Sequence, residues 1–198
     1  MKEVLKKDNP TIEDVRNGLR DVLAFIGEDP GREGLLETPD RIIRSWSELY
    51  AGYDQSPEEI LSKRFTETDG YDQMVLLKNI GFFSNCEHHQ LPFIGVVHIG
   101  YLPGKCVVGI SKLARLAECH ARRMQIQERM TKSIADDIMK YLKPKGAAVV
   151  VEGQHLCMQS RGVKKIGAVM VTSAMEGIFK DNEGGCKDEF LTLIGTES

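Results

Sequence analysis

Two short segments of the chain combine cysteine with histidine. The first is Cys86-Glu87-His88-His89, and the second is His155-Leu156-Cys157. A cysteine and a histidine separated by two residues can reach one metal ion from a tight turn, and zinc accepts thiolate and imidazole together. A catalytic zinc site keeps three protein ligands and leaves the fourth position for water. The two segments therefore predict a metal site, but spacing leaves open which of the five side chains bind and whether the site is catalytic or structural.

The second segment carries most of this prediction, since a lone Cys-x-x-His is common and a buried cysteine behaves as a small hydrophobe. On an expected strand, His155 and Cys157 would point to the same face because side chains alternate. Both would then face one cavity. If two cysteines and one histidine bind the metal, the remaining histidines are free to move protons.

Basic residues near these segments indicate an anion site. Ser111-Lys112-x-x-Arg115 opens an expected helix with Ser111 as its N-cap, and a helix N-terminus attracts phosphate. Arg161 follows Cys157 by four residues. A solvated basic face is the ordinary explanation for one such cluster. Together, the capping position and the short step from Cys157 to Arg161 favour a polyphosphate near the metal. A further candidate pair is Arg41 and Arg44.

Gln127-Glu128 offers a possible guanine contact. A carboxylate can accept hydrogen bonds from N1 and the exocyclic amino group of guanine, a pairing that adenine cannot offer. A plain surface glutamate explains the same residue, and spacing does not decide between the two.

Composition limits the classes of protein that fit. The formal net charge of -3 argues against a broad nucleic-acid surface. No stretch approaches the roughly 20 apolar residues of a membrane helix, and the polar segment Met1–Asn9 does not read as a secretory signal. Five cysteines, an odd number without a dense framework, favour a reducing compartment. We expect a cytoplasmic protein without a nucleic-acid or membrane partner.

Hydrophobic periodicity predicts an α+β chain. An amphipathic helix is expected over Thr11–Ile26, with Ile12 and Val22 in its buried stripe, and a second helix from Thr38-Pro39. Thr11 is expected to cap the first helix, with Asp14 completing a capping box. We expect a helical arm over residues 1–70 and a catalytic domain over 71–198, with an antiparallel sheet of about four strands and two inserted helices. Pro103-Gly104 is predicted to turn a hairpin whose returning strand is Cys106–Ile110. The expected strands are Met74–Ile80, Phe93–Leu102, Ala147–Glu152 with His155–Gln159, and Ala168–Ser173; the expected inserted helices are Lys112–Met124 and Ile126–Leu142; Lys187–Ile194 fits a helix or a strand.

In this order the motifs resemble those of GTP cyclohydrolase I, from about residue 11 to the end. The match departs from the family at Gly167-Ala168-Val169-Met170, where a Ser/Thr-rich strand is usual. The matching motifs are Glu37-Thr38-Pro39-x-Arg41, Cys86-Glu87-His88-His89, Gly100-Tyr101-Leu102-Pro103, Gly109-Ile110-Ser111-Lys112-Leu113-Ala114-Arg115, Gln125-Ile126-Gln127-Glu128-Arg129, His155-Leu156-Cys157-Met158, Arg161-Gly162-Val163 and Glu189-Phe190-Leu191.

The resemblance implies a role for each matched residue. Zinc ligands fall on Cys86, His89 and Cys157, and acid–base histidines on His88 and His155. Ser111 is implied to help in a later phase of the reaction. The guanine-binding carboxylate falls on Glu128, with Gln127 beside it, and the triphosphate-binding side chains fall on Ser111, Lys112, Arg115 and Arg161, with Arg41 and Arg44 from the helical arm.

The resemblance also implies the fold, assembly and reaction. The fold would be the tunnelling fold, and the assembly a homodecamer with active sites between subunits. The implied reaction is zinc-dependent hydrolysis of GTP at purine C8, with release of formate and rearrangement to 7,8-dihydroneopterin triphosphate, the first step of pterin and folate biosynthesis. The resemblance does not establish whether the protein has an allosteric site or which pathway uses the product.

Two other readings compete with this one. One is a non-catalytic nucleotide-binding module whose zinc is closed by four protein ligands. The other keeps the fold but uses a cysteine nucleophile and a nicotinamide cofactor, as nitrile-reducing relatives do. The sequence has no Gly-rich nicotinamide fingerprint, and its two metal-type clusters argue against that route.

Overall fold

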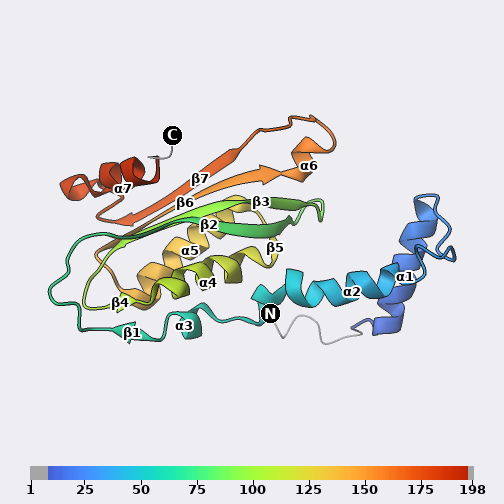
Figure 1. The fold of residues 1–198 in the computed structure, drawn as a ribbon, viewed down its shortest axis with the longest axis horizontal. Helices are drawn as coiled ribbons and strands as arrows, with labels where there is room; N and C mark the ends of the chain where they lie inside the picture. Colours follow the sequence, from blue (N-terminus) through green and yellow to red (C-terminus); the bar gives the residue numbers. More distant parts are fainter. Residues whose placement is uncertain (1–8, 196–198) are drawn as a thin grey trace. The chain divides into compact units, whose positions relative to one another are not determined.

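A computed structural model describes residues 9–195, which fall into two compact units (Figure 1). The first unit ends at Glu48 and the second begins at Leu49. Apart from Asn9, the polar segment Met1–Asn9 lies outside the described residues. Within residues 9–195, no helix is both long and apolar enough to cross a membrane.

The first unit contains α1 (Ile12–Phe25) and α2 (Thr38–Leu49), which continues to the first residue of the second unit. Thr11 caps α1 as its sequence predicts, since its hydroxyl accepts from the backbone N–H of Asp14 and Asp14 accepts from the N–H of Thr11. The expected buried stripe of α1 is wrong for the single chain, because Ile12 and Val22 remain 66% and 55% exposed.

The second unit is built on a five-stranded sheet in the order β5-β2-β3-β6-β7. The four long strands pair antiparallel, each with the next along the chain, and the short β5 pairs parallel to β2. The α+β prediction is confirmed. The fifth strand is not among the expected ones, because Met124 is expected to end one inserted helix and Gln125 to separate it from the next. The strands are β2 (Val75–Cys86), β3 (Pro92–Leu102), β5 (Met124–Gln125), β6 (Gly146–His155) and β7 (Met170–Gly177).

Two helices inserted between β3 and β6 cover one face of this sheet (Figure 1). They are α4 (Ile110–Ala121) and α5 (Gln127–Leu142). Apolar residues of α5 recur at intervals of four, so Met130, Ile134 and Ile138 all face the sheet and are fully buried. They pack with inward side chains of the strands into the main core.

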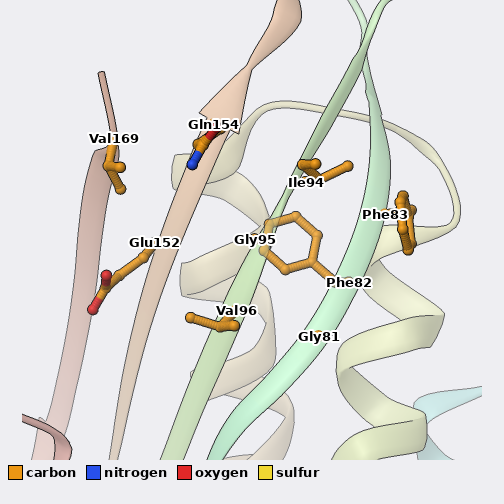
Figure 2. Close-up of a pocket in the computed structure, with 9 residues that line it drawn as sticks. All are labelled: Gly81, Phe82, Phe83, Ile94, Gly95, Val96, Glu152, Gln154 and Val169. Atoms are coloured by element: carbon orange, nitrogen blue, oxygen red, sulfur yellow. The ribbon is translucent and has the colours of Figure 1, made fainter. Parts of the chain in front are cut away.

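The opposite face of the sheet is covered only in part. The C-terminal helix α7 (Cys186–Ile194) packs Phe190 against this face at Gly100, together with Ala148 and Phe179. Beyond α7, an open apolar hollow of about 430 Å³ lies over β2, β3 and β6 (Figure 2). Its lining residues are Gly81, Phe82, Phe83, Ile94, Gly95, Val96, Glu152, Gln154 and Val169.

The predicted hairpin at Pro103-Gly104 is wrong. The strand after it, β4 (Val107–Val108), pairs with β1 (Arg64–Phe65) rather than with β3. The side chain of Tyr101 explains this path, because its buried hydroxyl accepts a hydrogen bond from the Val108 N–H. The remaining short elements are η1 (Ala51–Asp54), α3 (Pro57–Ile60), α6 (Leu156–Gln159) and η2 (Glu183–Gly185).

Candidate active site

The first cysteine–histidine segment forms a tight turn at the end of β2. Cys86 is the last residue of the strand, and its carbonyl accepts from the N–H groups of His89 and Gln90. The Glu87 N–H donates to the Gln125 carbonyl of β5, which anchors the turn on its other side. Cys86 is therefore buried while His88 and His89 project from an exposed turn.

The turn brings together the three residues expected to bind a metal. One donor atom each from Cys86, His89 and Cys157 lies within 4.8 Å of the other two. Cys86 Sγ lies 3.7 Å from Nδ1 of His89. Burial raises the pKa of the Cys157 thiol, and the neighbouring Cys86 thiol adds to this effect.

The reason given for placing His155 and Cys157 on one face is wrong. Strand β6 ends at His155, and Cys157 lies on the short helix α6. The helical turn, rather than strand alternation, directs Cys157 toward Cys86. The prediction of Cys157 as a ligand does not depend on the strand.

Two thiols and one imidazole suit zinc, and this donor set is found in catalytic zinc sites with an open fourth position. Among the residues that the structure describes, this is the group of three or more potential ligands that converges. The nearby His88 Nδ1 lies 3.9 Å from Cys86 Sγ, but His88 is not part of the converging group. The residues present therefore fit a three-ligand zinc site.

His155 lies beside this group at the end of β6. Its ring stacks on Phe93, with centroids 4.5 Å apart and an interplanar angle of 5°. Nε2 lies 2.9 Å from Oε1 of Gln127. Burial lowers the pKa of His155, and the negative charge of Glu128 opposes that effect. A neutral imidazole held this way can accept or pass a proton.

Gln127 and Glu128 are adjacent in the first turn of α5, but their side chains point in different directions. Glu128 is exposed and close enough to act on the charge of His155. Gln127 points instead into the protein and is 1% exposed, with its amide bonded to β6 and β7. The side chain of Gln127 is thus hydrogen-bonded inside the protein, not offered to a substrate.

The predicted phosphate-binding residues are not all brought together in one chain. Arg161 is exposed in the loop after α6, and its positive charge acts on the Cys157 thiol. Ser111, Lys112 and Arg115 lie at the start of α4. Ser111 is not the N-cap, because Gly109 occupies that position and no side chain caps the helix.

The start of α4 lies at the opposite end of the sheet from the cysteines. Strand β3 begins beside His155, where Phe93 pairs with it, and ends where Leu102 pairs with Gly146. Its eleven residues span about 35 Å at roughly 3.3 Å per residue. Because α4 begins after this far end, Ser111 and Cys86 of one chain are separated by much of the sheet's length.

Arg41 and Arg44 belong to the first unit. Both are exposed on α2, and Arg41 Nη2 forms an ion pair of 2.8 Å with Glu37. This pair joins the first turn of α2 to the residue just before the helix.

Sequence reasoning missed the residues that support the metal-binding turn. Arg129 forms an ion pair with Glu87 and donates through Nε to Oε1 of Gln125 at 2.8 Å. Gln125 in turn donates to the His120 carbonyl at 3.0 Å. The motif Gln125-Ile126-Gln127-Glu128-Arg129 carried this signal, since its polar residues include two that are buried.

The open hollow on the sheet is separate from this site. None of the residues expected to bind metal or move protons is among those that line it. The side chains of its lining residues Ile94 and Glu152 alternate with the inward-facing Phe93 and Val151 of the same strands (Figure 2).

Fold and site together define an α+β protein in which a cysteine–histidine group that could hold a metal lies beside a partly buried histidine. A family model described as GTP cyclohydrolase I matches residues 15–195. GTP cyclohydrolase 1 of Wolinella succinogenes is 57% identical over 176 residues, covering 89% of this chain and 93% of the relative. That of Bartonella bacilliformis is 47% identical over 189 residues, covering 96% and 91%. The chain belongs to the GTP cyclohydrolase I family and is an enzyme.

One solved structure is also similar. A crystal structure of the archaeosine synthase QueF-Like in its apo form is 18% identical, with a TM-score of 0.46. It covers 54% of this chain and 96% of its own.

Proposed function

We propose that this protein hydrolyses GTP at C8 of its purine ring and releases formate, giving 7,8-dihydroneopterin triphosphate, the first step of pterin and folate biosynthesis. The observation that carries this proposal is the convergence of Cys86, His89 and Cys157 beside His155 in a chain of this family. The proposed fold is the tunnelling fold, supported by four antiparallel strands with two helices between the middle pair.

The proposed ligands of zinc are Cys86, His89 and Cys157. When bound there, zinc would supply Lewis acidity and lower the pKa of water toward neutrality. Two thiols and an imidazole leave room in its coordination for substrate and water.

The chain's own residues would bind the purine and move protons. Glu128 is proposed to accept hydrogen bonds from the guanine N1 and amino groups, because its exposed carboxylate adjoins His155. His155 and His88 are proposed to carry protons during ring opening and formate release. The lowered pKa of His155 supports this role, since a neutral imidazole can take a proton at neutral pH.

The triphosphate site is proposed to form between subunits of a homo-oligomer, expected to be a decamer. Arg161 lies near Cys157 in the same chain, whereas Ser111, Lys112 and Arg115 begin α4 at the far end of the sheet. If all four contact one GTP molecule, the α4 residues must come from a second copy. Arg41 and Arg44 are proposed to contribute from α2, and Ser111 to assist the later rearrangement.

The proposed compartment is the cytoplasm. All five cysteines, which lie within the described residues, are free thiols. Unpaired cysteines suit a reducing environment.

The deciding experiment is incubation of the zinc-loaded protein with GTP and measurement of formate and of pterin fluorescence after oxidation. We expect both products in equal amounts. The His155→Ala variant should keep zinc and fold but lose turnover. A zinc-loaded wild-type protein that yields neither product would refute the activity, and an unchanged turnover in His155→Ala would favour a binding module.

A further inference from the structure

The side-chain amide of Gln127 reaches across the core to the imidazole of His155. Gln127 is the first residue of α5, and its Oε1 lies 2.9 Å from His155 Nε2. Its Nε2 donates to the backbone carbonyls of Val151 at 3.0 Å and Met170 at 2.9 Å. The amide thus links α5 to β6 and β7 and ends on the proposed proton carrier.

The two carbonyls determine which way the amide faces. A backbone carbonyl only accepts hydrogen bonds, so the NH₂ group of Gln127 must point toward Val151 and Met170. The amide oxygen is then directed at His155, and it too only accepts. His155 must therefore donate from Nε2, which leaves Nδ1 of the neutral ring as its acceptor.

The surrounding residues keep this hydrogen bond in place. A Cβ atom at Gly153 would lie 2.4 Å from Oε1 of Gln127, so a side chain at that position would displace the amide. Phe93 holds the plane of the His155 ring by stacking and is itself fully buried against Phe82. Phe93 therefore fixes the plane of the His155 ring, and Gln127 fixes the position of its Nε2 edge.

A hydroxyl pair supports the amide from the other side. Thr172 Oγ1 lies 3.1 Å from Nε2 of Gln127 and 2.6 Å from Thr131 Oγ1. Thr131 is buried and also donates to the Gln127 carbonyl. The two hydrogens of the Gln127 NH₂ group thus have three acceptors within reach, and its oxygen lies against His155, so neither end of this buried amide lacks a partner.

We propose that Gln127 is a positioning residue that fixes His155 as the Nε2–H tautomer and leaves Nδ1 as the acceptor nitrogen of the ring. This inference rests on the proposed role of His155 in GTP hydrolysis. The exposed Glu128 would then contact the substrate, while the buried Gln127 orients His155.

The kinetic test replaces Gln127 with methionine, which keeps the length of the side chain but removes both hydrogen-bonding functions. We expect kcat to fall on the order of a hundredfold, the contribution of one proton-transfer group, while KM for GTP changes little. Gly153→Ala should reproduce the loss by displacing Oε1. Gly81→Ala on β2 of the same sheet is the matched control, since a Cβ there meets nothing within 4 Å.

The spectroscopic test reads the tautomer directly. Solid-state ¹⁵N NMR of histidine-labelled, zinc-loaded enzyme distinguishes protonated from bare ring nitrogens, and His155→Asn identifies the His155 signals by their absence. At a pH above the ordinary histidine pKa, wild type should show protonated Nε2 and bare Nδ1. Gln127→Met should show a mixture of tautomers.

The two readouts separate the possible failures. A Gln127→Met enzyme with an unchanged tautomer, or with an unchanged kcat, overturns the inference. If that variant does not fold, Gly153→Ala decides by the same two measurements. If wild type releases no formate, the proposed function fails, whereas the nitrogen signals still show whether Gln127 sets the tautomer.

Discussion

At the scale of single residues, the site depends on donor atoms contributed by segments distant in the sequence. Cys86 and His89 come from one turn, whereas Cys157 lies on α6, which begins at Leu156. Burial raises the pKa of the Cys157 thiol, so a metal that binds there must displace its proton.

Replacing Cys157 by alanine should remove most of the bound zinc and abolish formate release, because two donors hold zinc far less tightly than three. Zinc per chain is measured by atomic absorption after dialysis. Cys106→Ala is the control, since the Cys106 thiol donates to the Leu142 carbonyl and lies outside the converging group. Full zinc content in Cys157→Ala would contradict the assignment.

Replacing Glu128 by glutamine should lower kcat/KM for GTP by about tenfold to a hundredfold, because a hydrogen bond to a charged group contributes about 1.5–3 kcal/mol. The loss follows from offering an amide NH₂ where guanine presents N–H donors. Steady-state formate release measures it, with exposed Glu67→Gln as the control. Unchanged kinetics in Glu128→Gln would remove Glu128 from the guanine site.

At the scale of elements, the pairing of β3 with β6 holds the site together, since Phe93 and His155 are register partners. Gly95 lies two residues into this pairing, and a Cβ there would come within 1.8 Å of the Glu152 carbonyl oxygen. The two strands can approach at this point only because Gly95 has no side chain.

Gly95→Ala should therefore destabilise the protein by roughly 2 kcal/mol or more, as substitutions that force a backbone shift in the core do. Thermal unfolding followed by circular dichroism measures the change. Gly81→Ala on the adjacent β2 meets open space and should unfold close to the wild-type temperature. Equal unfolding temperatures for the two variants would show that β3 and β6 tolerate the extra atom.

The ion pair between α1 and α2 predicts a pH dependence in the first unit. The hydrogen bond from Arg16 to Asp40 lowers the pKa of that carboxyl below its ordinary value. The pKa of Asp40 is lower in the folded than in the unfolded state. The contact therefore stabilises the folded unit at pH values above the ordinary aspartate pKa, and this stabilisation is lost as pH falls through the lowered pKa. Arg16→Gln should raise the pKa of Asp40 in an NMR titration, whereas Arg32→Gln should not.

At the scale of the whole molecule, one chain does not gather all the predicted phosphate-binding residues. The metal group lies at one end of the sheet and the start of α4 follows the other end. An active site that uses both must therefore be shared between copies of the chain.

Mixed oligomers test this sharing. Cys157→Ser and Arg115→Ala should each be inactive alone, but co-expressed they should recover part of the wild-type activity, because some sites combine an intact metal group with an intact α4. Cys157→Ser mixed with His155→Ala should recover none, since both changes damage the same end of the sheet. Verified mixed oligomers of the first pair that remain inactive would contradict the shared site.

Local patterns in the sequence predicted the elements well. The period-four apolar residues of α5 and the alternating strands depend on contacts within one element, so residue spacing alone reveals them. The capping box at Thr11 and Asp14 is local in the same way, and it is present as predicted. The errors lie where a distant group intervenes, as with β4, which pairs with β1 in place of β3.

The sequence by itself determined the α+β class, the family and the candidate ligands, because these follow from residue types, their spacing and short motifs. Only the tertiary structure decided that Cys157 meets Cys86 from a helical turn, and that Gln127 faces His155 rather than solvent. It also decided that Ser111 lies far from the metal group of its own chain. These outcomes depend on strand register and on packing between distant segments, which spacing along the chain does not encode.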